Sequence, residues 1–119
     1  TQEGEEQIVL DAYTSLLRSN PQLRLILVPR HPERADNVAK LIESHQLDCT
    51  RLSSLPSTDA SKVNEHKSFS SAWQVILGDT VGDLKWLWSL ADVAFVGGSF
   101  GDRGGQNMIE PLAFGATVC

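Results

Sequence analysis

The chain has 119 residues, of which 41% are hydrophobic and 21% charged, the composition of a single ordinary globular domain. Ten Lys and Arg residues stand against fifteen Asp and Glu residues, a formal net charge of -5 with no basic cluster, so nucleic acid is excluded as an expected partner. No apolar run approaches the roughly 20 residues of a membrane-spanning helix. Cys49 and Cys119 lack the spacing and the histidine neighbours of a metal site, so we expect two reduced thiols and no metal.

The first element we expect is a helix that begins near Glu5 and Glu6 and runs to about Ser19. The two carboxylates suit the positive end of the helix dipole, so we expect them to be solvated or to compensate that dipole. The apolar residues that share one face, and that should point inward, are Val9, Ala12, Tyr13, Leu16 and Leu17.

A strand, a second helix and a second strand follow. Residues 23–28 are almost continuously apolar, which is typical of a strand covered on both faces. A helix should begin at Pro32 and end before a short strand around residues 49–52. Its buried side is expected to hold Ala35, Val38, Leu41, Ile42 and His45. The serine-rich segment from Ser53 to Ser71 is predicted to be a flexible polar surface loop without assigned chemistry.

The second half of the chain repeats the alternation. Residues 73–77 form the next predicted strand, and Thr80 with Asp83 matches a capping box, which predicts a helix beginning there. The residues expected to face inward from that helix are Leu84, Leu87, Trp88 and Ala91. A strand over residues 93–96, a glycine-rich loop, a helix over residues 107–114 capped by Gly115, and the start of a last strand complete the chain.

This alternation predicts an α/β fold, a Rossmann-like, mostly parallel sheet with helices on both faces. In such sheets, ligands bind at the carboxyl ends of the strands. The loops expected there contain Arg30 and His31, then residues 78–80, then residues 97–107. Three polar loops that lie far apart in the sequence should therefore meet at one edge of the sheet.

The glycine loop carries the strongest local signal. Five of the nine residues 97–105 are glycine, among them Gly97, Gly98, Gly104 and Gly105, so the backbone can adopt positive φ and approach a ligand closely. Such a loop before a helix N-terminus is an anion site. Glu110, one helical turn after the helix start, could accept hydrogen bonds from a sugar hydroxyl. The loop matches neither a dinucleotide fingerprint nor a P-loop, and a plain strand-to-helix turn with glycine caps is the alternative.

The other two loops leave alternatives open. Arg30 and His31 could contact a phosphate or carboxylate, or they could belong to an exposed charge cluster with Glu33 and Arg34. Asp79 and Thr80 are expected to act as cap and turn residues, with a backbone that could border a base.

Three further features complete this interpretation. Glu3 and Gly4 occupy the position of a first loop between strand and helix. His45 is expected to be a packed histidine at the edge of the core. The order of residues suggests no catalytic triad, and both ends of the chain look cut, so we expect a fragment of a longer protein.

Several sequence blocks together resemble the bacterial 3-deoxy-D-manno-octulosonic acid (Kdo) transferase family. They occur in the family's order and cover nearly the whole chain outside the polar segment. The blocks are Glu3-Gly4-Glu5-Glu6, Leu27-Val28-Pro29-Arg30-His31-Pro32-Glu33-Arg34, Gly78-Asp79-Thr80-Val81-Gly82-Asp83-Leu84, Ala91-Asp92-Val93-Ala94-Phe95-Val96-Gly97-Gly98-Ser99, Arg103-Gly104-Gly105-Gln106-Asn107 and Glu110-Pro111.

The resemblance implies one half of a GT-B glycosyltransferase, which transfers Kdo from CMP-Kdo to a lipid A precursor in lipopolysaccharide biosynthesis. Residues 1–119 look like part of the C-terminal, nucleotide-sugar-binding domain. The implied enzyme works at the cytoplasmic face of the inner membrane without a cofactor or a metal. The acceptor surface, the membrane-associating segment and a catalytic carboxylate would lie in the N-terminal half, so this fragment should be soluble and inactive alone.

The resemblance also assigns roles to residues. Arg30 would meet the charged groups of the donor, Gly78, Asp79 and Thr80 would border the cytosine, and Glu110 would hold the ribose. The residues expected to cradle the phosphate and the Kdo carboxylate are Gly98, Ser99, Gly104, Gly105 and Asn107. The chain has Gln106 where the family commonly has histidine, and glutamine keeps hydrogen bonding but cannot become cationic.

Two rival classes remain at this stage. Another GT-B enzyme, such as a UDP-sugar transferase or an epimerase, would share the glycine loop and a glutamate on the following helix. A flavodoxin-like protein-binding domain would use the same loops to contact a partner protein.

Overall fold

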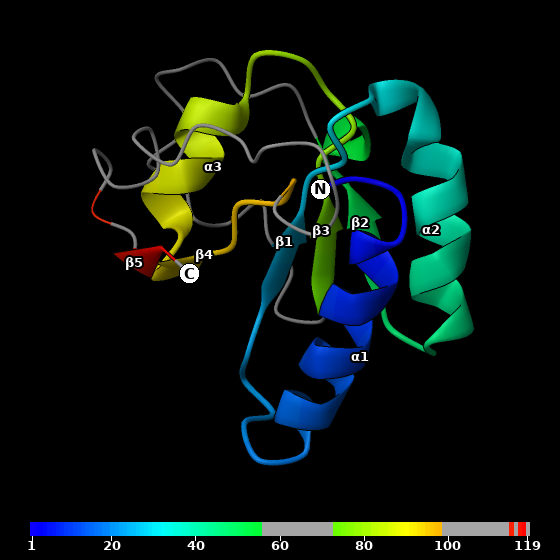
Figure 1. The fold of residues 1–119 in the computed structure, drawn as a ribbon, viewed down its shortest axis with the longest axis vertical. Coiled ribbons are helices and arrows are strands. Elements are labelled where there is room, and N and C mark those ends of the chain that lie inside the picture. Colours follow the sequence, from blue (N-terminus) through cyan, green and yellow to red (C-terminus); the bar gives the residue numbers. More distant parts are fainter. Residues whose placement is uncertain (56–72, 99–114, 116, 119) are drawn as a thin grey trace.

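The structure is a computed structural model, and it describes residues 1–55, 73–98, 115, 117 and 118. Helices and strands alternate along the chain (Figure 1). They are α1 (Glu5–Leu17), β1 (Leu25–Leu27), the 3₁₀ turn η1 (Pro32–Arg34), α2 (Ala35–Ser44), β2 (Cys49–Arg51), the 3₁₀ turn η2 (Leu52–Ser54), β3 (Val75–Leu77), α3 (Leu84–Leu90), β4 (Val93–Ala94) and β5 (Thr117–Val118). Among these described segments, no helix has the length and apolar character needed to cross a membrane.

Every strand pair within the described residues is parallel, which confirms the predicted α/β class. One sheet has the order β1-β3-β2, with Leu25 and Cys49 both in register with Val75, and β4 pairs with β5 in a second sheet. Figure 1 shows α1 and α2 on one side of the three-stranded sheet and α3 on the other. The single continuous sheet that we expected is therefore divided into two in the described residues.

The strand that is buried throughout is β3, not β1. All three residues of β3 are buried, whereas Leu25 and Ile26 of β1 are only half-buried. The expectation that residues 23–28 form a strand covered on both faces is therefore wrong in part. The physical reason is position, because β3 lies between two neighbours and β1 lies at an edge of the sheet.

The main core lies between α1, α2 and the three-stranded sheet. Its buried members are Leu10, Tyr13, Leu27, Ala35, Val38, Ala39, Ile42, Leu47, Val75 and Leu77. The predicted buried face of α2 is largely confirmed, and Pro32 begins the helical segment as expected. His45 lies at the edge of this core, where its ring is bonded to Leu41 and Asp11, as predicted.

The predicted inward face of α1 is wrong in part. Ala12 is exposed and Leu16 is 52% exposed, whereas Leu10 is fully buried. The buried stripe runs through Glu6, Leu10 and Tyr13, a helical spacing that begins at a carboxylate. A count of apolar residues alone could not find a stripe with a charged first member.

The segment before α3 also differs from the prediction. Thr80 Oγ1 donates a hydrogen bond to Asp83 Oδ2 at 2.5 Å, but neither side chain caps the helix, which begins only at Leu84. Gly82 between them has a φ of 97°, a left-handed conformation that a right-handed helix cannot include. Of the predicted inward residues only Leu87 is buried, and Leu84 is 38% exposed.

Several predictions fall on residues outside the described part of the chain. They are most of the polar segment from Ser53 to Ser71, the glycine loop beyond Gly98, and the helix over residues 107–114. Gly115 is described, and its φ of 84° is the conformation that a C-cap glycine adopts.

Candidate functional site

The carboxyl ends of β1, β3 and β4 lead into the three loops that we singled out from the sequence. Leu27 ends β1 shortly before Arg30, Leu77 ends β3 directly before Gly78, and β4 ends at Ala94, shortly before Gly97 and Gly98. Gly78 N donates a hydrogen bond to Leu27 O at 2.9 Å, so the first two loops leave the same sheet side by side. The third loop is linked to them through the first residues of the chain.

Thr1 lies against the loop that follows β1. Its nitrogen donates to Val28 O at 2.7 Å, and Arg30 N donates to Thr1 O at 2.9 Å. This alternation around Pro29 is the pattern of a parallel β-bridge. The start of the chain therefore continues the edge of β1 and holds the backbone on both sides of Pro29.

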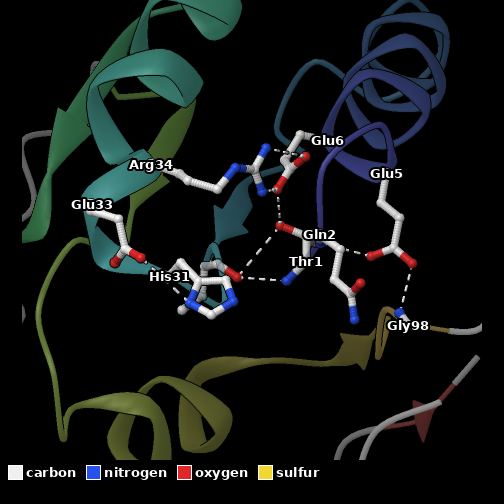
Figure 2. Close-up of polar contacts among 9 residues, drawn as sticks. Thr1, Gln2, Glu5, Glu6, His31, Glu33, Arg34 and Gly98 are labelled. Carbon is white, nitrogen blue, oxygen red and sulfur yellow. Dashed lines mark hydrogen bonds and ion pairs between the residues drawn. The ribbon is translucent and has the colours of Figure 1, made fainter. Parts of the chain in front are cut away.

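Glu6 is the anchor of this region. The residue is 1% exposed. Its carboxylate accepts hydrogen bonds from Arg34 Nη1 and Nη2 at 3.0 and 3.4 Å and from Thr1 Oγ1 at 3.0 Å. Figure 2 shows the guanidinium of Arg34 facing this carboxylate. Because a buried charge is tolerated only when it is paired and hydrogen-bonded, the Glu6–Arg34 pair is a specific link between α1 and η1.

Glu5 points away from Glu6 and toward the third loop. Its Oε2 accepts from Gln2 N at 2.8 Å and its Oε1 from Gly98 N at 2.6 Å, and the residue is 3% exposed (Figure 2). The expectation that Glu5 and Glu6 are solvated or merely compensate the helix dipole is therefore wrong. Both carboxylates are buried because backbone N–H groups and a guanidinium replace their water.

The loop after β1 exposes two of the predicted site residues. Arg30 and His31 are exposed, and His31 Nδ1 lies 3.6 Å from Glu33 Oε1, with both side chains more than half exposed. The alternative of an exposed charge cluster is thus confirmed for His31 and Glu33. It is wrong for Arg34, whose partner is the buried Glu6.

The loop after β3 is held by its own side chains. Asp79 accepts hydrogen bonds from Ser53 N at 2.8 Å and Ser53 Oγ at 2.6 Å, and Arg51 Nη1 lies 3.9 Å from its Oδ2. Thr80 is engaged with Asp83. These contacts agree with turn roles for both residues, although the predicted helix cap at Thr80 does not form.

Close packing or a left-handed backbone accounts for three of the predicted glycines. A Cβ on Gly78 would lie 2.9 Å from a methyl group of Val28, so packing requires glycine there. Gly4 has a φ of 91° at the start of α1, and Gly98 has a φ of 92° with its N–H bonded to Glu5. Glu3 beside Gly4 is exposed. The predicted residues Ser99, Gly104, Gly105, Gln106, Asn107 and Glu110 lie outside the described residues.

The described residues hold no cluster of three His, Cys, Asp or Glu side chains that could bind a metal. Cys49 is a free thiol, and burial raises its pKa. Cys119 lies outside the described residues.

Sequence reasoning missed Thr1, Glu5, Glu6 and Arg34 as residues that organise this region. One signal could have found Glu6, because a stripe drawn backwards from Leu10 and Tyr13 by helical spacing reaches it. The links of Thr1 to Val28 and of Glu5 to Gly98 depend on how distant segments meet, and no local pattern encodes them.

Comparison with known proteins gives consistent relatives. No protein-family model matches the chain. The chain is 42% identical over 118 residues to the 3-deoxy-D-manno-octulosonic acid transferase of Haemophilus influenzae, and 35% identical over 121 residues to that of Bordetella pertussis. Each alignment covers 99% of this chain but only 25% and 26% of the relative, so the chain spans about a quarter of their length.

A solved structure extends this likeness to three dimensions. The C-terminal CMP-Kdo binding domain of WaaA from Acinetobacter baumannii superposes with a TM-score of 0.82 at 34% identity. The match covers 99% of this chain and 56% of that one. The division into two described sheets therefore occurs within a fold that matches a known nucleotide-sugar-binding domain.

Proposed function

The chain belongs to the 3-deoxy-D-manno-octulosonic acid (Kdo) transferase family, and we propose that it forms the part of such an enzyme that binds the CMP-Kdo donor. One observation carries this proposal. The chain shares its fold, at 34% identity and over 99% of its length, with a domain known for CMP-Kdo binding. The exposed Arg30 and the loops at the carboxyl ends of β1 and β3 supply groups where such a ligand would bind.

The described contacts refine the proposed roles. Arg30 is exposed at the end of β1, so its guanidinium can pair with the charged groups of the donor. The side chains of Asp79 and Thr80 are engaged within the protein, so the cytosine would be bordered by backbone atoms of residues 78–80. His31, Glu3 and Gly4, which are all exposed, would line the neighbouring surface.

The phosphate and Kdo carboxylate would be held mainly by the rest of the glycine loop. Because the N–H of Gly98 is bonded to Glu5, we assign the anion contacts to Ser99, Gly104, Gly105 and Asn107. Glu110 would hold the ribose. The Gln106 side chain would contribute hydrogen bonds without a positive charge.

The activity of the whole protein follows as part of the same proposal. It would be a GT-B glycosyltransferase that transfers Kdo to a lipid A precursor in lipopolysaccharide biosynthesis, at the cytoplasmic face of the inner membrane. The acceptor would bind to the other half of the enzyme. Positive groups and N–H donors of this domain would stabilise the departing CMP electrostatically, and no residue of this chain is proposed as a catalyst.

Calorimetric titration of the chain with CMP tests the proposal. We expect binding of CMP that UMP and AMP do not match, and no transferase activity by the chain alone. The Arg30→Ala variant should bind CMP about tenfold more weakly because it loses a charge-assisted contact. Arg18→Ala, which removes another exposed cation directly after the C-terminal end of α1, should bind normally.

Two outcomes would contradict the proposal. Equal binding heats for CMP and for unrelated nucleotides would contradict the assignment of CMP-Kdo as the donor. Preferential binding of UMP or UDP would instead favour a UDP-sugar enzyme of the same GT-B class.

A further inference from the structure

We propose that Glu5 is a positioning residue for the donor site, which sets the start of the glycine loop without touching the ligand. This inference rests on the proposed function, since it concerns the same site. The buried carboxylate joins two parts of the chain that are 93 residues apart in sequence, Glu5 at the start of α1 and Gly98 after β4.

Both oxygens of Glu5 are used within the protein. Oε2 accepts from Gln2 N at 2.8 Å and Oε1 accepts from Gly98 N at 2.6 Å. Hydrogen bonds to a charged acceptor in a site with 3% exposure are strong, because water does not compete for either partner. Gly98 is therefore held at a fixed point relative to α1.

Gly97 is shaped around the same carboxylate. A Cβ on Gly97 would overlap the Glu5 carboxylate and lie 3.2 Å from Thr1 Cα. Two successive residues of the third loop thus depend on Glu5, one through a hydrogen bond and the other through space. The close approach of Gly97 is thus a second contact of this loop with the same carboxylate, in addition to the hydrogen bond from Gly98.

The adjacent Glu6 fixes the loop that follows β1. Glu6 binds Arg34, which lies four residues after Arg30, while Glu5 binds Gly98 (Figure 2). The two neighbouring carboxylates at the start of α1 therefore set the loop after β1 and the loop after β4 relative to each other. Binding sites need such support, because a displacement of about 1 Å in a contacting group weakens its interactions.

The Glu5→Gln variant tests this role. Glutamine keeps the volume, but its NH₂ group cannot accept a hydrogen bond, so either Gln2 or Gly98 loses its acceptor. We expect affinity for CMP to fall about tenfold or more, from the loss of a charge-assisted bond. Affinity for cytidine, which lacks the phosphate, should change less than about twofold, so the ratio of the two affinities should fall.

Two further measurements distinguish positioning from a general loss of structure. Glu43→Gln removes an exposed carboxylate of α2 and should leave both affinities unchanged. In the unmodified protein, the Gly98 amide should be protected from hydrogen exchange, and Glu5→Gln should accelerate its exchange more than that of Leu77 in β3. Rapid exchange of Gly98 in the unmodified protein would overturn the inference even if the variant failed to fold.

The outcomes separate this inference from the proposed function. If the unmodified protein binds CMP and the variant keeps the same ratio of CMP to cytidine affinity, the positioning role is wrong and the proposed function stands. Tighter binding of CMP by Glu5→Gln would also overturn the inference, because Glu5 would then compete with the phosphate for Gly98. If the unmodified protein binds no CMP, the proposed function fails, and this inference fails with it.

Discussion

The part of the protein before residue 78 and the part after it are held together by different forces. In the first part, α1, α2 and the three-stranded sheet enclose a continuous apolar core. In the second part, α3 and β4 bury Leu87 and Ala94 but leave Leu84, Leu90 and Val93 from 38% to 64% exposed. Among the described residues, packing therefore defines the first part, whereas the described section of the second part contacts it through specific links such as the bond between Glu5 and Gly98.

Those contacts lie next to the proposed site. Gly98 is tied to Glu5 by a hydrogen bond, and Leu87 lies close enough to Gly78 that a Cβ there would be 3.5 Å from Leu87 Cδ1. The comparison indicates that stability resides in the first part and that the geometry of the third loop depends on polar links. Substitutions in the first part should therefore mainly change stability, whereas substitutions at the polar links should also change the geometry of the third loop.

The largest effect should come from the core of the first part. Ile42 is 0% exposed, so Ile42→Ala should lower the free energy of unfolding by about 4 kcal/mol through lost contacts and a cavity. Leu87→Ala should cost about 2 kcal/mol, because its neighbours in α3 are partly exposed and can relax. Urea denaturation measures both.

Leu16→Ala serves as the control for this pair. Leu16 is 52% exposed in α1, so its truncation should cost less than about 1 kcal/mol. Equal losses for Ile42→Ala and Leu87→Ala would show that the second part has a core of its own, contrary to the comparison.

The next effect concerns the polar link between α1 and η1. Arg34→Ala leaves the carboxylate of Glu6 buried without its cation, so it should lower the free energy of unfolding by about 3 kcal/mol. Glu6→Gln should cost less, because the side chain of Arg34 is 24% exposed and can turn its charge toward water. The control is Lys40→Ala, which removes an exposed cation from α2 and should change the free energy of unfolding far less than Arg34→Ala does. A larger loss for Glu6→Gln than for Arg34→Ala would contradict this asymmetry.

Removal of the Tyr13 hydroxyl should lower the free energy of unfolding by a smaller amount. This hydroxyl donates to Leu23 O at 2.8 Å and lies 3.0 Å from Gln74 O, so it bridges the starts of β1 and β3. Burial raises the pKa of Tyr13. Tyr13→Phe keeps the ring but removes this donor. Because Gln74 O still accepts a hydrogen bond from Leu25 N, the loss should be about 1 kcal/mol. A thermal unfolding curve unchanged from that of the unmodified protein would show that the bridge contributes nothing.

The elements of the first part could largely be predicted from the sequence, because their signals are local. Pro32 begins a helical segment, the apolar stripe of α2 follows helical spacing, and the alternation of elements predicts a parallel sheet. The expected helix start at Thr80 failed because the left-handed Gly82 interrupts the capping box. The relative burial of β1 and β3 was also missed, since it depends on the order of strands in the sheet.

The candidate site could be predicted as a set of loops but not as a set of contacts. Strand order brings Arg30 and Gly78 to one edge, and that placement follows from topology. The burial of Glu5 and Glu6 does not, because it requires partners 93 and 28 residues away. Carboxylates at a helix start are common on surfaces, so their local pattern gives no sign of the buried links that they form here.

The smallest effect is a shift of one pKa at the outer edge of the first part. His45 Nδ1 donates to Leu41 O at 2.9 Å and Nε2 lies 2.9 Å from Asp11 Oδ1. The Leu41 carbonyl and, after it, the Asp11 carboxylate raise the pKa of His45, and the bond to His45 lowers the pKa of Asp11. The raised pKa of His45 contributes stability that is full below its ordinary value of 6.5 and is lost as the pH rises through the raised value. The lowered pKa of Asp11 contributes stability that is full above its ordinary value of 3.8 and is lost as the pH falls through the lowered value. The pair therefore stabilises the contact of α1 with α2 most fully between about pH 3.8 and pH 6.5.

NMR titration of the His45 ring tests this assignment. Asp11→Asn should lower the pKa of His45 toward 6.5 but not below it, because the bond to the Leu41 carbonyl remains. Asp36→Asn, which removes a carboxylate from α2 that pairs with Arg51 instead, should leave the pKa of His45 unchanged. If Asp11→Asn left this pKa unaltered, the Asp11 carboxylate would make no electrostatic contribution to the contact between α1 and α2 at His45, contrary to this assignment.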